Sequence, residues 1–175
     1  FKLTQAMGGG KTHSLITLGL LAKHPELRAA VLAGLPDAAA LPPVRVIAFS
    51  GRESDIPNGI WGEIARQVEK QSDFKDYYAP LKAPGRSAWI NLLKGEPTLI
   101  LLDELPPYLD NARAIAVGNS DLSHVTATAL TNLFEAVAEA DLGNVCIVLT
   151  DLVGTYAEAS AQIAGLLRQV QDEAQ

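Results

Sequence analysis

The chain has 175 residues, 48% of them hydrophobic and 19% charged, a composition typical of one soluble globular domain with a proper core. Its net charge of -6 argues against bulk electrostatic binding of nucleic acid, so we expect any DNA contact to come only through other domains. Its apolar runs are too short to span a membrane, so no membrane partner is predicted. A single cysteine, Cys146, excludes a disulfide-held fold and favours a cytoplasmic location.

The chain begins at Phe1, without an initiator methionine and without a basic, apolar leader. The first predicted strand begins at the same point. We therefore expect residues 1–175 to form one domain that is a piece of a longer polypeptide.

A triple glycine, Gly8 to Gly10, follows this strand and is followed in turn by Lys11 and Thr12. Glycines permit a tight turn whose N–H groups point inward, where they can hold the phosphates of a nucleotide. Lys11 would reach the β- and γ-phosphates, Thr12 offers a hydroxyl to Mg²⁺, and the next helix adds the positive end of its dipole. Gln5 stands where a phosphate-binding loop usually has its first glycine. The segment alone therefore also fits an ordinary strand-to-helix connection.

Helical and strand patterns alternate through the first half of the chain. We predict helices over residues 12–23 and 27–33, a loop over 34–37 and a strand over 44–50. Another helix, introduced by residues 54–57, runs to about Lys70 and buries Trp61. An irregular connector over 71–86 follows, and then a short helix over 87–94 that is capped by Ser87 and closed by Gly95.

The strand predicted over residues 98–104 has four consecutive apolar residues and ends in Asp103 and Glu104. A continuous apolar run suits a strand buried on both faces of a parallel sheet. Its carboxyl end is where open α/β sheets bind their ligands. Asp103 can hold Mg²⁺ there, and Glu104 is placed to orient or deprotonate an attacking water.

Residues 105–108 are expected to turn away from the sheet, and 118–124 to form a polar loop that ends with His124 just before a helix over 125–140. A strand over 145–150 and a helix from Thr155 to about Gln171 complete the pattern. This alternation predicts a three-layer α/β/α sandwich with a mainly parallel sheet.

The glycine loop and the acidic strand end should lie on the same rim of that sheet, and together they predict a site for ATP and Mg²⁺. Thr12 and Asp103 are the predicted metal ligands, and Glu104 and Lys11 the predicted catalytic groups. His13 lies in the first helical turn with no side-chain task assigned. The predicted nucleotide-binding residues are Gln5, Ala6, Met7, Gly8, Gly9, Gly10, Lys11, Thr12 and His13.

These motifs resemble those of P-loop ATPases, and the acidic pair resembles the additional-strand (ASCE) branch, which includes the AAA+ ATPases. The resemblance implies that Thr150 senses the γ-phosphate; a hydroxyl that merely satisfies strand-end backbone is the alternative. It also implies a lid domain and a last strand, both absent from this sequence. An arginine supplied in trans is expected, with Arg86, Arg113 and Arg168 as candidates that also suit ordinary surface positions.

Three segments carry a closer resemblance: residues 4–13, 20–27 and 101–108. They are similar to large bacterial ATP-binding proteins of unassigned biochemical role that are often linked to phage-defence loci carrying DNA methyltransferases. Glutamine at the position of Gln5 would be usual in that family. The resemblance covers most of this chain but only the ATPase core of such a protein.

The expected function is ATP binding and Mg²⁺-dependent hydrolysis that drives motion or signalling in a larger, phage-defence-related protein. ATP and the rest of that protein are the expected partners, and a homo-oligomer stays open. One alternative is a nucleotide-dependent switch or scaffold that binds ATP with negligible hydrolysis. Another is a small-molecule phosphotransferase. The acidic pair fits the activation of a water molecule better than the activation of an acceptor substrate, which a phosphotransferase requires.

Overall fold

The computed structural model describes residues 1–4, 9–52, 55–151, 161, 163–165 and 168. Four strands form the main sheet, namely β1 (Lys2–Thr4), β2 (Arg45–Ser50), β3 (Thr98–Asp103) and β6 (Val145–Asp151). Their order is β1-β6-β3-β2 and every neighbouring pair is parallel. The strand that ends in Asp103 is therefore separated from the first strand by β6.

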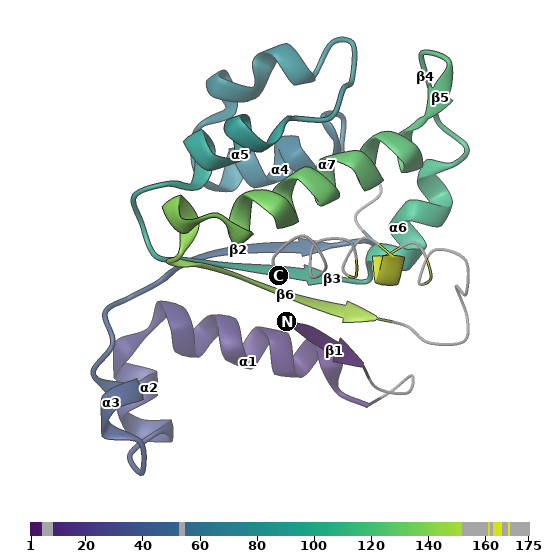
Figure 1. The fold of residues 1–175 in the computed structure, drawn as a ribbon. Coiled ribbons are helices and arrows are strands. Elements are labelled where there is room, and N and C mark those ends of the chain that lie inside the picture. The colour runs from purple at the N-terminus through teal and green to yellow at the C-terminus, as the bar shows by residue number, and fades with distance from the viewer. Residues whose placement is uncertain (5–8, 53–54, 152–160, 162, 166–167, 169–175) are drawn as a thin grey trace.

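Helices cover both faces of this sheet, in an arrangement compatible with the predicted three-layer sandwich (Figure 1). One face carries α1 (Lys11–Lys23), followed by α2 (Pro25–Val31) and α3 (Pro36–Ala39). The other face carries α4 (Gly59–Gln67), α5 (Arg86–Leu93), α6 (Leu105–Ala112) and α7 (Leu122–Ala138). Two short 3₁₀ helices, η1 (Gln71–Tyr77) and η2 (Ala140–Leu142), and an antiparallel hairpin of β4 (Ala116–Val117) and β5 (Ser120–Asp121) complete the described elements.

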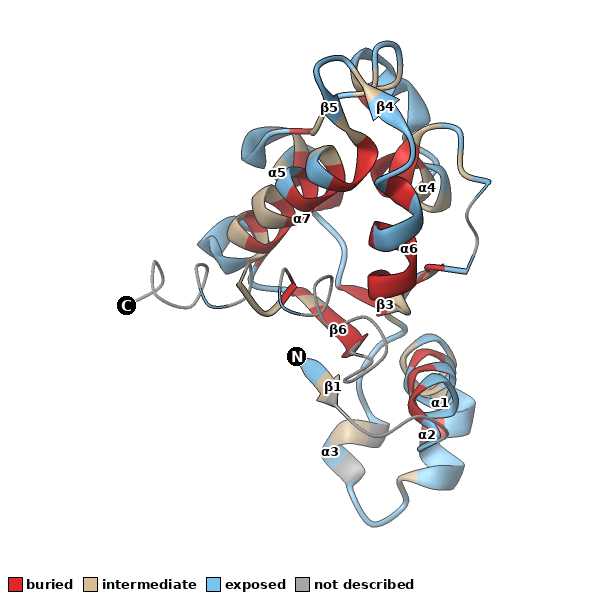
Figure 2. Cartoon of the chain, turned by 90° about the vertical axis from the view of Figure 1, so that its right-hand side faces the viewer, coloured by how far each residue is buried: buried red, intermediate tan, exposed pale blue. Residues whose placement is uncertain are grey.

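The apolar run of β3 is buried on both faces, as the sequence predicts for a central strand. Ile100 and Leu102 join the large core under α4 to α7, which includes the fully buried Trp61. Leu99 and Leu101 join a much smaller core under α1. Figure 2 shows the same difference, because burial is extensive in α6 and α7 and limited to one stripe of α1.

The α1 side is a thin layer with an apolar outer surface. Among the described residues, nine large hydrophobic side chains are exposed, and seven of them lie within residues 16–41, namely Ile16, Leu18, Leu20, Leu27, Val31, Leu35 and Leu41. Buried Arg28 ties this layer together, since its guanidinium donates to the carbonyl of Ala22 at 2.8 Å and to that of Pro42 at 3.0 Å. The helices α1 and α2 are thus joined to the chain that leads into β2.

The segment predicted to turn away at residues 105–108 is instead the start of α6. Proline has no N–H to lose in the first turn of a helix, so Pro106 is tolerated there. The change of direction takes place one residue earlier, at Glu104, whose φ is 54°. The prediction of a turn is therefore wrong, because proline disrupts the interior of a helix but fits its first turn.

Three other helix boundaries differ from the predictions. His124 lies inside the first turn of α7, where its N–H donates to the Asp121 carboxylate at 2.9 Å, so Asp121 is the capping residue. Ser87 is not a cap, because α5 begins at Arg86 after Gly85. The helix predicted to reach Lys70 ends at Gln67, and Glu69 has a left-handed φ of 58° that a helix cannot continue through.

Smaller differences affect the loops. The second helix begins at Pro25, two residues before the predicted start, and α3 occupies part of the loop predicted over 34–37. Most of the helix predicted after Thr155 lies outside the described residues. Among the helices that the structure describes, none combines the length and apolar composition needed to cross a bilayer.

Candidate functional site

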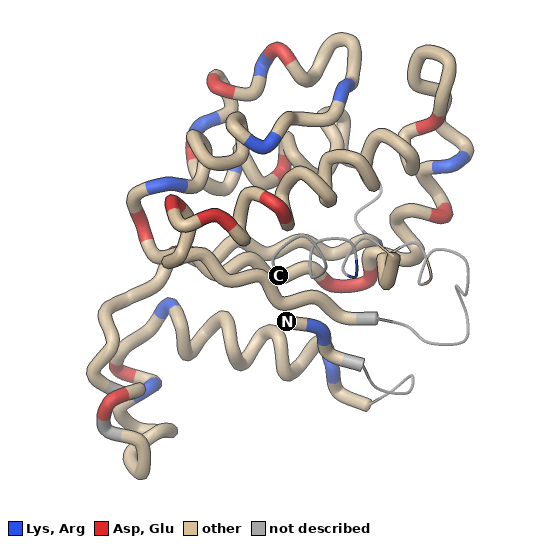
Figure 3. Tube along the Cα trace, viewed as in Figure 1, with Lys and Arg blue, Asp and Glu red and all other residues tan. Residues whose placement is uncertain are grey.

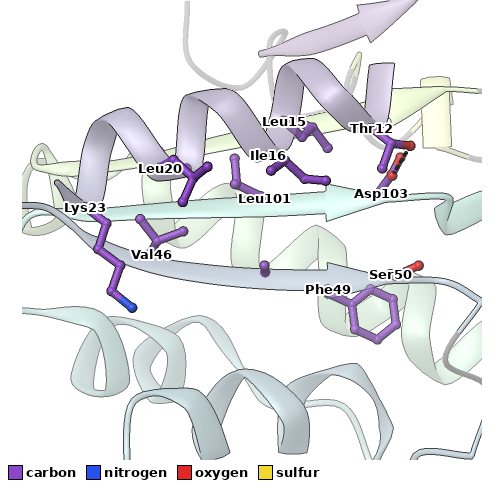
Figure 4. Close-up of a pocket in the computed structure, with 12 residues that line it drawn as sticks. Thr12, Leu15, Ile16, Leu20, Lys23, Val46, Phe49, Ser50, Leu101 and Asp103 are labelled. Atoms are coloured by element: carbon purple, nitrogen blue, oxygen red, sulfur yellow. Dashed lines mark hydrogen bonds between the residues drawn. The ribbon is translucent and has the colours of Figure 1, made fainter. Parts of the chain in front are cut away.

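The first turn of α1 meets the carboxyl end of β3 on one rim of the sheet. The Thr12 hydroxyl donates a hydrogen bond of 2.7 Å to Oδ2 of Asp103, although the two residues are 91 positions apart in the chain (Figure 4). The structure therefore brings together the glycine-lysine-threonine segment and the acidic strand end that the sequence singled out.

Gly10 caps the N-terminus of α1 in a conformation that glycine favours. Its φ is +77°, and no further atom of the described residues lies within 4 Å of where a Cβ would be, so the described structure leaves the space beside it open. Having no side chain, Gly10 cannot accept from the N–H groups of the first turn, which also carries no acidic residue. This end of α1 thus keeps the positive character that attracts an anion.

The other predicted loop residues lie around this turn. Lys11 is the first residue of α1 and is only 8% exposed. Gly9 and His13 are exposed. Four of the predicted nucleotide-binding residues, Gln5, Ala6, Met7 and Gly8, lie outside the described part of the chain.

Asp103 is held from both sides. Its Oδ2 accepts from Thr12 on α1, and its Oδ1 accepts from the Thr150 hydroxyl on β6. Thr150 has no exposed surface, and its hydroxyl oxygen also accepts the N–H of Glu104 at 3.2 Å. The carboxylate is therefore fixed by contacts from two different elements.

Glu104 leaves the end of β3 in a left-handed backbone conformation and forms an ion pair with Arg52. Its Oε2 lies against Nε of Arg52; the Glu104 side chain is 17% exposed and the Arg52 side chain 74%. Left-handed non-glycine residues are uncommon and concentrate at functional sites, where surrounding contacts hold them. This feature adds an independent reason to place chemistry at Glu104.

The turn after β2 supplies the contact that holds Glu104. The N–H of Gly51 donates to the carbonyl of Asp103 at 2.8 Å. A Cβ on Gly51 would lie 1.9 Å from the carbonyl oxygen of Glu104, so only glycine fits there. The sequence predictions missed both Gly51 and Arg52. Their position directly after a parallel strand, on the same rim as Asp103, was the available signal.

The three arginines proposed for a trans role lie on or beside helices. Arg86 forms an ion pair with Glu139 at 3.1 Å, just beyond the end of α7. Arg113 follows α6 as its C-cap, and Arg168 is an exposed helical residue. Arg86 is thus engaged by Glu139 and not by the acidic pair.

Two buried aromatic rings, Phe49 and Tyr108, pack against each other next to the site. Phe49 on β2 and Tyr108 on α6 pack edge to face, with centroids 5.3 Å apart and planes at 89°. Burial raises the pKa of Tyr108, so its hydroxyl stays protonated at neutral pH. The ring is therefore an uncharged support one turn after Glu104.

A hollow of about 580 Å³ runs from the rim along α1 and beside β2. Figure 4 shows Ile16 and Leu20 of α1 on one side and Val46 of β2 on the other. Thr12 and Asp103 lie at one end of the hollow and Lys23 at the other. The wall is mostly apolar, and the polar groups gather at the rim.

Both acidic and basic residues lie at this rim. Figure 3 shows acidic residues at the carboxyl end of β3, and Lys11 is the first residue of α1. No group of three or more His, Cys, Asp or Glu side chains gathers within the part of the chain that is described. A cation here would take its remaining ligands from hydroxyl, phosphate and water oxygens, the coordination that Mg²⁺ commonly adopts beside nucleotides.

Residues 38–164 match the model of the DUF499 N-terminal domain, a stretch that is well over half of the chain. The chain belongs to this family. The matched region includes Arg52, Asp103, Glu104 and Thr150, whereas the glycine loop precedes it. Comparison with curated proteins gave no match, and comparison with solved structures gave none either.

Proposed function

We propose that this domain binds ATP and hydrolyses it in a Mg²⁺-dependent reaction, as a P-loop ATPase core of the additional-strand type. The hydrogen bond from Thr12 to Asp103 carries the proposal, because it joins a helix N-terminus suited to phosphates with a carboxylate suited to a cation. The sheet order supports it too, since β6 separates β3 from β1 as in the ASCE ATPases that the motifs resemble.

The donor set at the rim fits Mg²⁺ and phosphate. Thr12 gives its only hydroxyl proton to Asp103, so the oxygen lone pairs remain for a cation. The open space beside Gly10 and the positive end of α1 suit the phosphate chain, and Lys11 adds a positive charge at the same turn. When bound, Mg²⁺ would neutralise charge on the phosphate oxygens.

Glu104 is the proposed general base. It takes a proton from the attacking water as the water oxygen bonds to the γ-phosphorus and the bond to the β–γ bridging oxygen breaks, leaving ADP and phosphate. Glu104 lies next to Asp103 at the strand end, so a water that it orients stands beside the phosphate site. Arg52, the ion-pair partner of Glu104, is mostly exposed, and in this proposal it moves away when ATP enters.

In a larger, phage-defence-related protein, this reaction would drive motion or signalling through other domains. Those domains are the proposed partners besides ATP. DNA would be contacted only through them, given the net charge of -6. A cytoplasmic location follows from the same proposal.

Substitution of Glu104 by glutamine tests the proposal. The variant keeps its hydrogen-bonding oxygen but loses the base, so turnover should fall by about 10²- to 10⁴-fold while ATP affinity stays near wild type. Turnover is measured as phosphate release and affinity by titration with a fluorescent ATP analogue. Glu139→Gln is the matched control, because Glu139 pairs with Arg86 away from the site and should change neither value. Unchanged hydrolysis in Glu104→Gln would remove the role given to Glu104.

A second candidate is a switch that binds ATP with negligible hydrolysis. The ion pair with Arg52 favours it, because that contact occupies the Glu104 carboxylate. In that case wild-type protein would bind ATP tightly with negligible turnover, and Arg52→Ala would raise turnover. Rapid hydrolysis by the wild type would exclude the switch.

A further inference from the structure

The position of Thr150 points to a role in holding the acidic pair. Leu102 of β3 pairs with Leu149 of β6, so the next residue on each strand, Asp103 and Thr150, are neighbours at the rim. The Thr150 side chain is fully buried, so its hydroxyl depends on protein partners. Among the described residues the hydroxyl has two partners, Asp103 and Glu104, which are the acidic pair.

The hydroxyl uses its donor and one acceptor position at once. Its proton goes to Oδ1 of Asp103, and its oxygen accepts the N–H of Glu104 at 3.2 Å. Glu104 has left the strand ladder in a left-handed conformation, so its N–H needs another acceptor. A hydroxyl satisfies both groups, whereas a methyl group in its place would satisfy neither.

We infer that Thr150 is a positioning residue, which orients the Asp103 carboxylate and fixes the backbone at Glu104. Thr12 on α1 holds the other oxygen of Asp103, so the orientation of this carboxylate depends on two hydroxyls from two different elements. Direct contact with the γ-phosphate is the alternative role, and it requires the Thr150 hydroxyl to give up its donation to Asp103, because a hydroxyl has one proton. The consequence for turnover rests on the proposed ATPase function, whereas the consequence for the Glu104 backbone does not.

Amide hydrogen exchange of Glu104, followed by NMR on the intact protein without nucleotide, tests the inference independently of activity. In wild type the Glu104 amide should be protected. Thr150→Val keeps the shape but removes the hydroxyl, so exchange at Glu104 should accelerate by up to about tenfold, the loss of one hydrogen bond. The amide of Ile100, within the β3 ladder, should be unchanged, and Thr150→Ser should restore protection at Glu104. Thr150→Ala is the second hydroxyl-free variant if valine disturbs folding.

Turnover provides the second measurement. Thr150→Val should lower kcat by about tenfold or more and raise the Mg²⁺ concentration for half-maximal rate, while ATP affinity without Mg²⁺ stays unchanged. Thr150→Ser should restore both kcat and the Mg²⁺ concentration.

Absence of Glu104 protection in wild type, or unchanged exchange in both hydroxyl-free variants, overturns the inference. A loss of kcat with unchanged exchange also overturns it and favours γ-phosphate sensing. Equal acceleration at Ile100 and Glu104 overturns it in favour of general destabilisation. A wild type without turnover contradicts the ATPase proposal, and the exchange result then decides the inference alone.

Discussion

The backbone position of Glu104 depends on Gly51, a residue in the turn after β2. Gly51 follows β2 and donates its N–H to the carbonyl of Asp103, while its α-carbon lies against the carbonyl of Glu104. Backbone of the β2 turn thus packs directly on backbone of the acidic strand end. This contact explains why the turn after β2 belongs to the site although it carries no predicted motif.

Substitution of Gly51 by alanine should disturb this contact. The added methyl would lie 1.9 Å from the Glu104 carbonyl oxygen, so the backbone must shift, and we expect the free energy of unfolding to fall by about 1–3 kcal/mol. Urea denaturation measures this loss. Gly34→Ala is the control, because nothing lies within 4 Å of its added Cβ. Equal stability of the two variants would show that the β2 turn does not constrain Glu104.

At the scale of elements, α7 lies on the side of the sheet opposite α1 (Figure 1), and its start depends on one side chain. Asp121 accepts the N–H of His124 at 2.9 Å and caps the helix. Asp121→Ala should therefore lower the free energy of unfolding by about 1 kcal/mol, whereas Asp121→Asn should retain most of the stability, because asparagine caps as well as aspartate. Thermal unfolding of both variants checks this; equal losses would point to lost charge and not to capping.

The strands could be predicted closely because an apolar run of this length between turn residues has few conformations available other than a buried strand. The starts of β2 and β3 were placed within one residue, and Asp103 was correctly assigned to the strand end. Helix starts were harder, because more than one residue near each start could serve as a cap. Ser87 is the predicted cap of α5, whereas the helix begins at Arg86 after Gly85, and the sequence analysis does not identify the Asp121 cap before His124. The start of α6 was missed because proline is favourable in a first helical turn and unfavourable later.

The site was predicted only in part, for a related reason. Thr12 and Asp103 were expected on the same rim, since parallel strands share their carboxyl ends, and the structure brings them together. Gly51 and Arg52 were missed because they matter through contacts between the turn after β2 and the turn after β3. Such contacts between turns leave no periodic pattern in the sequence. The hydrogen bonds of Thr150 depend on which residue of β6 lies beside Asp103 of β3. The pattern of apolar residues does not specify this strand register to the single residue.

At the scale of the whole molecule, the sheet order gathers groups that are far apart in the chain. Because β6 lies between β1 and β3, hydroxyl side chains of α1 and β6 both reach the carboxylate of Asp103 at the end of β3. The two faces of the sheet contribute unequally, because the face under α4 to α7 carries the large core and the α1 face only a small one. The site lies where the thin α1 layer meets the firmly packed strand end. Binding of Mg²⁺ and ATP should therefore add stability across the junction between α1 and β3.

The most direct test of the central claim measures thermal unfolding of the intact protein with ATP, with and without Mg²⁺. A ligand at a hundredfold its Kd stabilises the folded state by about 2.7 kcal/mol. We predict that ATP with Mg²⁺ raises the Tm of the wild type more than ATP alone, and that Asp103→Asn loses the Mg²⁺-dependent part only. Asp110→Asn, an exposed position on α6, is the control and should behave as wild type. A wild type whose Tm does not respond to ATP, or an Asp103→Asn variant that keeps the full Mg²⁺ effect, would contradict a joint ATP and Mg²⁺ site at Thr12 and Asp103.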